Sequence, residues 1–282
     1  VHGWSGQRNL LLKLEGHGRE SSLSGLVLDE TVGWFTSAYP LLLSCAEGSD
    51  ALGDWLCAVK EDYRSIPNKG LGYGVLRYLG GADELALSSS ESGCSLLFNY
   101  LGQFDSSVGE DTYFKRLDSY RGEEGSRRRG ITHPISLNGQ VSDGRLVFWL
   151  SYERSYFADA SMQALRARLE SGLREVVDHC CGLKSSVFTP SDFALSREAI
   201  TQRELSIWQS ERAIEDIYPA TPMQQGLIYH SSLDASAYVT QSMFTVKGVS
   251  AEVIRAAWQT IVDRYAICRT AFVLSDAGQY QQ

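Results

Sequence analysis

Three polar side chains of types that move or orient protons are spaced two apart near the start of the chain. Glu15, His17 and Arg19 alternate with Gly16 and Gly18 in the segment EGHGRE. Successive side chains of an extended segment point to opposite sides, so the three polar groups would share one face and the glycines would leave the other bare. A carboxylate and an imidazole can both act as general bases. This segment is therefore the candidate site for proton-transfer chemistry.

The same spacing also has a purely structural interpretation. Glu15 and Arg19 lie four residues apart on the same expected face, which suits a surface ion pair, and a close arginine would weaken the carboxylate as a base. From the spacing alone, the ion pair is the favoured interpretation. His17 projects from the face of Glu15, so the two groups cannot easily flank one carbon from opposite sides. A structural hydrogen bond is the favoured role of His17, and the role of second base is the alternative.

A second polar pair ends an apolar segment further along the chain. Asn99 and Tyr100 follow the run SLLF and precede Leu101. Polar groups at the end of an apolar strand are either hydrogen-bonded scaffolding or part of a site. Neighbouring residues of a regular strand alternate faces, so Asn99 and Tyr100 cannot both point into one cavity.

Alternating strands and helices must position these groups. The spacing of apolar residues predicts elements in the first two thirds of the chain as follows: a strand at 32–39 that Pro40 stops, helices at 52–63 and 162–176, a strand at 95–101, and a hairpin of strands 135–138 and 145–150. The strand 146–152 is apolar on both faces, which is typical of a sheet covered on both sides. These elements predict an α/β fold, an α+β sandwich with helices on a mixed, mostly antiparallel sheet.

The composition changes near residue 184. Residues 184–215 are polar with one short helical segment, which indicates a linker. The residues after 216 predict a capped helix from Thr221, a strand at 238–246, and an amphipathic helix from Ala251. The chain is therefore expected to comprise two parts joined by a linker.

Charge and composition exclude several classes of protein. The 282 residues carry a net charge of -8, which argues against a nucleic-acid partner because such binding needs clustered Lys and Arg. No apolar run approaches the ~20 residues of a membrane span, and no signal peptide opens the chain. The six cysteines show no CxxC pair and no metal-ligand spacing, so no metal site is expected and they are predicted to be small buried residues. A cytoplasmic protein is the expectation.

Four segments of the first part resemble, in order, signature sequences of the epimerization domains of nonribosomal peptide synthetases. They are EGHGRE at 15–20, VGWFTSAYP at 32–40, IPNKGLGYG at 66–74 and FNYLGQ at 98–103. Residues 216–227 and 264–272 resemble the first two signatures of synthetase condensation domains, with Tyr265 where that family usually has histidine. The resemblance implies the C-terminal part of an epimerization domain at 1–183, a linker at 184–215, and the truncated start of a condensation domain at 216–282.

The resemblance also implies a fold and a reaction. Both domains have a chloramphenicol-acetyltransferase-like fold of two lobes with the active site in a tunnel between them. Glu15 matches the family's catalytic glutamate, which faces the second histidine of an HHxxxDG signature that does not occur in these 282 residues. Tyr100 would be an enolate donor or proton relay. Asn99, Arg19 and His17 would contact the substrate or its carrier arm.

The expected activity is the L-to-D epimerization of an aminoacyl or peptidyl thioester, followed by peptide-bond condensation. The substrate would arrive on the 4'-phosphopantetheine of a carrier protein, with no tightly bound cofactor. Peptidyl carrier protein domains and adjacent synthetase domains are the expected partners, with neither nucleic acid nor membrane. The alternative is a non-catalytic fragment that docks a carrier protein.

Overall fold

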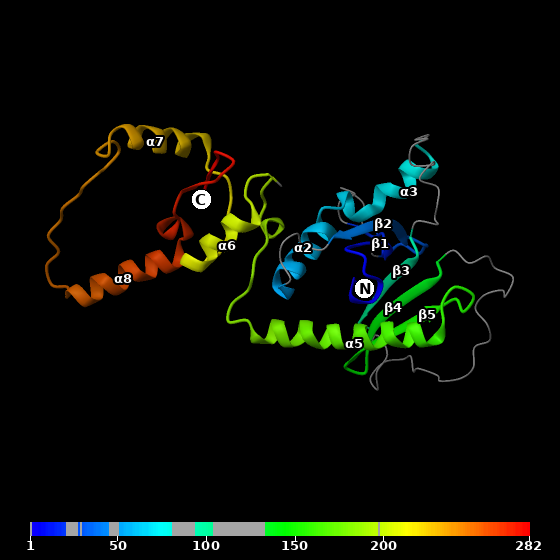
Figure 1. The fold of residues 1–282 in the computed structure, drawn as a ribbon. Coiled ribbons are helices and arrows are strands. Elements are labelled where there is room, and N and C mark those ends of the chain that lie inside the picture. Colours follow the sequence, from blue (N-terminus) through cyan, green and yellow to red (C-terminus); the bar gives the residue numbers. More distant parts are fainter. Residues whose placement is uncertain are drawn as a thin grey trace. The chain divides into compact units, whose positions relative to one another are not determined.

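The computed structural model describes residues 2–20, 28, 30–44, 51–80, 94–103, 133–196 and 198–282. The chain divides into two compact units, Val1–Ser185 and Ser186–Gln282. Figure 1 shows unit 1 in blue to green and unit 2 in green-yellow to red.

Unit 1 is built on a five-stranded mixed sheet with the strand order β2-β1-β3-β4-β5 (Figure 1). Its strands are β1 (Asn9–Gly16), β2 (Ser37–Ser44), β3 (Leu96–Gln103), β4 (Ile135–Ser142) and β5 (Arg145–Tyr152). β1 pairs antiparallel with β2 and parallel with β3, β3 pairs parallel with β4, and β4 pairs antiparallel with β5. The predicted mixed sheet is confirmed.

Helices cover one face of this sheet. They are α1 (His2–Ser5), α2 (Leu52–Arg64), the 3-10 helix η1 (Pro67–Gly70), α3 (Leu71–Tyr78) and α5 (Asp159–Gly182), the long green helix of Figure 1. Met162 and Leu165 of α5 are buried against Ile135 of β4. Leu12 of β1 and Leu41 of β2 are buried on the same face, because they are register partners of each other and Leu12 is also partner to Leu96. The apolar residues of α5 thus cover the sheet, as the spacing of apolar residues in this segment predicts.

The opposite face of the sheet carries exposed apolar side chains in the described part of unit 1. Leu11, Leu42 and Trp149 all lie on it, and Trp149 is 44% exposed. The prediction that strand 146–152 lies inside a sheet covered on both sides is therefore wrong. β5 is an edge strand, and its outward apolar residues lack a covering layer among the described residues.

A proline within β2 and a two-residue turn between β4 and β5 show how these strands form. Pro40 does not stop its strand, because β2 is an edge strand and proline's missing N–H removes no essential ladder bond there. Asp143 and Gly144 connect β4 and β5 with φ values of 53° and 66°. Two consecutive positive φ values match the tight two-residue turn that suits the twist of a hairpin. The predicted hairpin is confirmed.

Unit 2 has its own small core. Its elements are η3 (Pro190–Asp192), α6 (Gln202–Glu211), α7 (Pro222–Leu233), α8 (Ala251–Arg264), η4 (Ala266–Arg269), β6 (Val273–Leu274) and β7 (Tyr280–Gln281). Phe193, Ile200, Leu205 and Ile217 form a buried cluster. Residues 184–215, expected as a linker, thus supply most of this core.

Helix caps in unit 2 follow the sequence, but one predicted strand does not form. The side chain of Thr221 accepts a hydrogen bond from the backbone N–H of Gln224 in a capping box, as the sequence predicts. Residues 238–246, predicted as a strand, have no strand structure, and Tyr238 has a φ of 61°. No neighbouring strand among the described residues offers this segment a ladder.

The cysteines and helices give two further observations on the described residues. Cys180, Cys181 and Cys268 are exposed, so the expectation of small buried cysteines is wrong for these three; Cys45 lies outside the described residues. None of the described helices combines the length and apolar character needed to span a membrane.

Candidate functional site

Glu15 is the second-to-last residue of β1 and sits at the end of the strand ladder. Its register partners are Ala38 on β2 and Asn99 on β3, and Asn99 is in turn the partner of Asn138 on β4. Register partners share a face of the sheet. The sheet therefore brings Glu15 next to Asn99 on its less covered face, in a polar row that crosses three strands.

The chain leaves the strand directly after Gly16. Gly18 has a φ of 68°, and a Cβ at this position would lie 1.5 Å from the carbonyl oxygen of Phe35. Only glycine fits such a close approach in this conformation. The prediction that Glu15, His17 and Arg19 share one extended face is therefore wrong, because β1 ends at Gly16 and residues 17–20 turn away.

Arg19 donates its side-chain hydrogen bonds to the backbone of a neighbouring segment. Its guanidinium donates hydrogen bonds to the carbonyl oxygens of Leu28 and Thr31, the latter at 2.7 Å, and it lies 4.2 Å from the ring centroid of Phe35. Among the described residues, no ion pair joins Arg19 to Glu15. The surface ion pair considered from the spacing is thus not formed, and Arg19 stabilises the loop instead.

His17 uses both of its ring nitrogens within the same turn. Nδ1 accepts a hydrogen bond from the backbone N–H of Arg19 at 3.0 Å, and Nε2 lies 3.3 Å from a carboxylate oxygen of Glu20. An accepting Nδ1 leaves the proton of a neutral ring on Nε2, which then donates to Glu20. This arrangement favours the structural role of His17 over that of a base.

Glu20 and Lys69 link two segments that the sequence places 49 positions apart. Glu20 is 9% exposed, and its Oε2 lies 2.8 Å from Nζ of Lys69. The hydrogen bond from Lys69 and the charge of Glu20 raise the pKa of Lys69 above its usual value. No local spacing predicts this pair, although its two residues stand in the segments EGHGRE and IPNKGLGYG.

Tyr39 packs beside this ion pair. Burial, with smaller contributions from Tyr63 and Glu20, raises the pKa of Tyr39 to about 12. The phenol therefore stays neutral at physiological pH. The ring also lies against Gly70, where a Cβ would fall 2.0 Å from Cδ1 of Tyr39.

A cavity of about 1060 Å³ borders these groups. Much of its lining is apolar and comes from β1, β2, β3 and helices α2 and α5, including Leu14, Leu41, Val59, Phe98 and Leu169. Its polar lining includes Glu15, His17, Glu20, Lys69, Asn99 and Tyr100. The cavity therefore brings together Glu15, His17, Asn99 and Tyr100 of the predicted site residues, whereas Arg19 is not among its lining residues.

Tyr100 approaches the cavity from a different side than Glu15. It follows Asn99 on β3, so strand alternation places it on the helix-covered face, and it is 48% exposed. The register shifts between Tyr100 and Gln103, where Gly102 has a φ of 86°. Asn99 and Tyr100 thus lie on opposite faces, as the alternation predicts, near an irregular end of the strand. Both nevertheless line this one cavity, contrary to the expectation that they cannot share one.

Metal ligands are not gathered at this site. The described residues contain no group of three or more His, Cys, Asp and Glu side chains placed to hold a metal ion. The chemistry that the arrangement supports is proton transfer by a carboxylate next to neutral hydrogen-bond donors.

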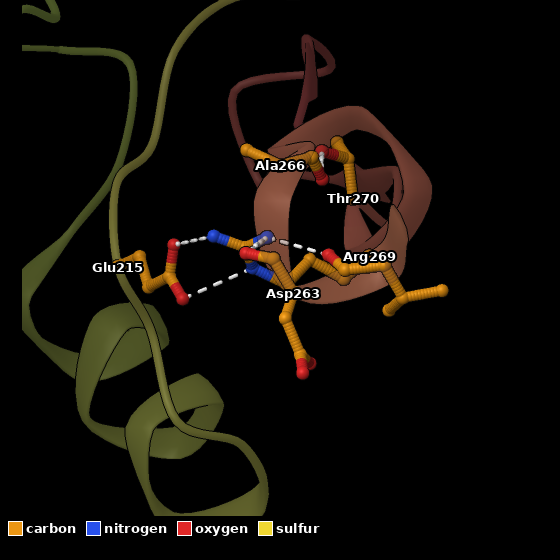
Figure 2. Close-up of polar contacts among 6 residues, drawn as sticks. Glu215, Asp263, Ala266, Arg269 and Thr270 are labelled. Carbon is orange, nitrogen blue, oxygen red and sulfur yellow. Dashed lines mark hydrogen bonds and ion pairs between the residues drawn. The ribbon is translucent and has the colours of Figure 1, made fainter. Parts of the chain in front are cut away.

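Unit 2 holds a smaller cavity of about 190 Å³. Arg269 beside it donates from Nε and Nη2 to the two carboxylate oxygens of Glu215, at 3.0 and 2.7 Å (Figure 2). Nη1 donates to the carbonyl oxygens of Val262 and Asp263 in the last turn of α8. The side-chain hydrogen bonds of Arg269 hold the pKa of Glu215 below its usual value. This cluster fixes the end of a helix and adds no nucleophile or base.

The sequence of the chain matches a known protein family over most of its length. The condensation domain family model matches residues 1–197 and 214–282. A linear gramicidin synthase protein of Brevibacillus parabrevis is 39% identical over 278 residues, which cover 97% of this chain and 4% of that protein. A mycosubtilin synthase protein of Bacillus subtilis is 36% identical over 278 residues, or 96% of this chain and 10% of that protein. The chain thus spans a small share of these relatives.

A solved structure extends the comparison to the fold. The crystal structure of the epimerization domain from the third module of tyrocidine synthetase B superposes with a TM-score of 0.56 and 28% identity, and it covers 64% of this chain and 39% of that chain. The mixed sheet with its helices therefore has the chloramphenicol-acetyltransferase-like fold expected from the sequence. Family match, relatives and fold agree that the chain belongs to the condensation-domain family of nonribosomal peptide synthetases.

Proposed function

We propose that unit 1 is the C-terminal part of an epimerization domain, which converts an aminoacyl or peptidyl thioester from the L to the D configuration at its α-carbon. The observation that carries the proposal is the placement of Glu15 at the end of β1, beside Asn99 and bordering the large cavity. The similarity to the tyrocidine synthetase epimerization domain supports this reaction within the broader family.

Epimerization requires a general base and hydrogen-bond donors to the enolate oxygen. The α C–H bond breaks, the proton passes to the base, and the electron pair delocalises into the thioester carbonyl as an enolate. A new C–H bond then forms on the opposite face of the carbon. Glu15 is the proposed base, and neutral donors near the carbonyl lower the barrier by stabilising the enolate oxygen.

Asn99 and Tyr100 are the proposed donors. Asn99 shares a face with Glu15, and Tyr100 lines the same cavity from the other face of the strand. His17 and Arg19 hold the turn after β1 through their own hydrogen bonds, so their proposed contribution is to the shape of the site. The group that acts on the opposite face belongs, by the family resemblance, to the HHxxxDG segment.

The partners follow from the chemistry of the substrate. A thioester on the 4'-phosphopantetheine of a peptidyl carrier protein supplies an acidified α-proton, so the proposed domain needs no bound cofactor of its own. Residues 216–282 are proposed to begin a condensation domain, which forms the next peptide bond with the D-configured donor. The alternative is that unit 1 docks a carrier protein without turning over its substrate.

The test follows α-proton exchange in deuterated water. The whole synthetase that contains this chain is loaded with an aminoacyl thioester, and deuterium incorporation at the α-carbon is measured with Glu15→Gln and with the exposed control Glu211→Gln. We expect incorporation in the wild type and the control, and a loss of about 100-fold or more in Glu15→Gln, the usual range for a general base. No incorporation in the wild type would favour the docking alternative, and incorporation that survives Glu15→Gln would place the base elsewhere.

A further inference from the structure

Glu20 is a buried carboxylate that the proposed reaction does not use. It is 9% exposed, and its two oxygens face different partners, Nζ of Lys69 at 2.8 Å and Nε2 of His17 at 3.3 Å. A buried carboxylate is costly unless it is paired and hydrogen-bonded. Glu20 meets that requirement only while the 17–20 turn and η1 stay in their present places.

The Lys69 side of this link has an unusual backbone conformation. Asn68 and Lys69 have φ values of 47° and 50°, and Gly70 follows with a φ of 77° against the ring of Tyr39. Non-glycine residues rarely adopt this conformation and persist in it where the surroundings hold them. Tyr39 is the register partner of Leu14, the neighbour of Glu15. η1 is therefore fixed to the same end of β1 that carries Glu15.

On its other side, Glu20 contacts His17, which directly follows the last residue of β1. His17 bonds the backbone N–H of Arg19 through Nδ1 and faces Glu20 through Nε2, so the turn closes on itself one residue beyond the ladder. The β1 ladder ends at Gly16. The ladder fixes the backbone of Glu15 between Ala38 and Asn99. Its side chain lines the same cavity as His17, Glu20 and Lys69, so the held turn forms part of the surroundings of the Glu15 carboxylate.

We propose that Glu20 is a positioning residue that, through its ion pair with Lys69, holds the turn after β1 and thereby sets the placement of the Glu15 carboxylate. The proposal rests on the proposed function for its catalytic consequence. Its structural part, the restraint of residues 15–20 by Lys69, stands independently. A misplacement of about 1 Å in a reacting group can cost on the order of 100-fold in rate.

Lys69→Met is the decisive variant, because Lys69 is 64% exposed at its side chain and methionine keeps the aliphatic stem while removing the charge. Lys184→Met is the matched control at an exposed lysine of unit 1. Lys69→Arg restores a cation at the same place. All three are made in the whole synthetase, and each is measured for kcat and KM of α-proton exchange and for backbone hydrogen exchange of residues 15–20.

In Lys69→Met we expect kcat to fall about tenfold or more with KM changed less than twofold, and the amides of 15–20 to exchange faster. Lys69→Arg should restore most of the kcat and most of the amide protection of residues 15–20. Lys184→Met should match the wild type in both. A lower melting temperature of Lys69→Met with unchanged kcat would show that the Glu20–Lys69 pair only stabilises the fold, and it would overturn the proposal. If the wild type shows no α-proton exchange, the proposed function fails by itself, and unchanged hydrogen exchange at 15–20 in Lys69→Met would overturn the restraint.

Discussion

Glu15 and Asn99 are register partners on the parallel strands β1 and β3, one position before β1 ends. The pairing places a carboxylate and an amide side by side on one face of the sheet. A carboxylate can take a proton, and an amide N–H can stabilise a negative oxygen, so the pair fits the enolate formation proposed for unit 1.

The first prediction tests this pairing. Asn99→Ala in the whole synthetase should lower kcat for α-proton exchange about 10- to 100-fold, since removal of one oxyanion donor typically costs 100-fold or more and the Tyr100 donor remains. Asn138→Ala is the matched control, one strand further along the same row but outside the cavity lining. It should stay near the wild type. Equal losses in both variants would show a general effect of the sheet surface and remove Asn99 from the site.

A second prediction concerns the hydroxyl of Tyr100. Tyr100→Phe removes only that oxygen from a side chain that is about half exposed, so folding should be unaffected. If the hydroxyl donates to the enolate or relays a proton, kcat should fall about tenfold or more. Tyr156→Phe, on an exposed tyrosine outside the cavity lining, serves as the control. An unchanged rate in Tyr100→Phe would end its proposed role.

Local patterns predicted much of the fold because they act over short distances. The Asp143-Gly144 turn, the apolar stripe of α5 and the capping box at Thr221 each depend on residues within a few positions, and each is present in the structure. The error at Pro40 arose because the cost of proline depends on whether a strand is at the edge, which is a property of the whole sheet.

The site was harder to predict because its geometry depends on contacts between segments far apart in the sequence. The period-two spacing of Glu15, His17 and Arg19 holds only while the chain is extended, and the positive φ of Gly18 ends that condition. The Glu20–Lys69 ion pair joins two loops through the fold, so no local spacing signals it. Glu15 and Asn99 stand in two separate segments that resemble family signatures, and only the sheet shows that they are register partners.

A third prediction uses two glycines of the IPNKGLGYG segment. Gly70→Ala should destabilise unit 1 by about 2 kcal/mol or more, because the residue has a positive φ and the new methyl would collide with the Tyr39 ring. Gly72→Ala is two residues away within α3, where a Cβ meets nothing within 4 Å. It should be neutral or stabilising by up to about 1 kcal/mol, since alanine favours a helix over glycine. Chemical denaturation measures both, and similar stabilities would contradict the close packing of Gly70.

The last prediction concerns pH and the Glu215–Arg269 pair of unit 2. Arg269 holds the pKa of Glu215 below its usual value, so the folded state favours the ionised carboxylate. A group with a depressed folded pKa contributes stability that is present above its unfolded pKa and is lost as the pH falls through the folded value. Glu215→Gln should therefore lower the melting temperature at pH 7 and approach the wild type at acidic pH.

The matched control for this experiment is Glu211→Gln, at an exposed glutamate that ends α6. It should change the melting temperature little at pH 7, because it breaks no ion pair among the described residues. The effect of Glu215→Gln should be modest, because water and salt screen an exposed ion pair. A difference between Glu215→Gln and the wild type that stays constant from pH 7 to pH 3 would show that the pair contributes through packing rather than charge. A difference that vanishes on acidification would show that Arg269 links the end of α8 to residue 215 electrostatically.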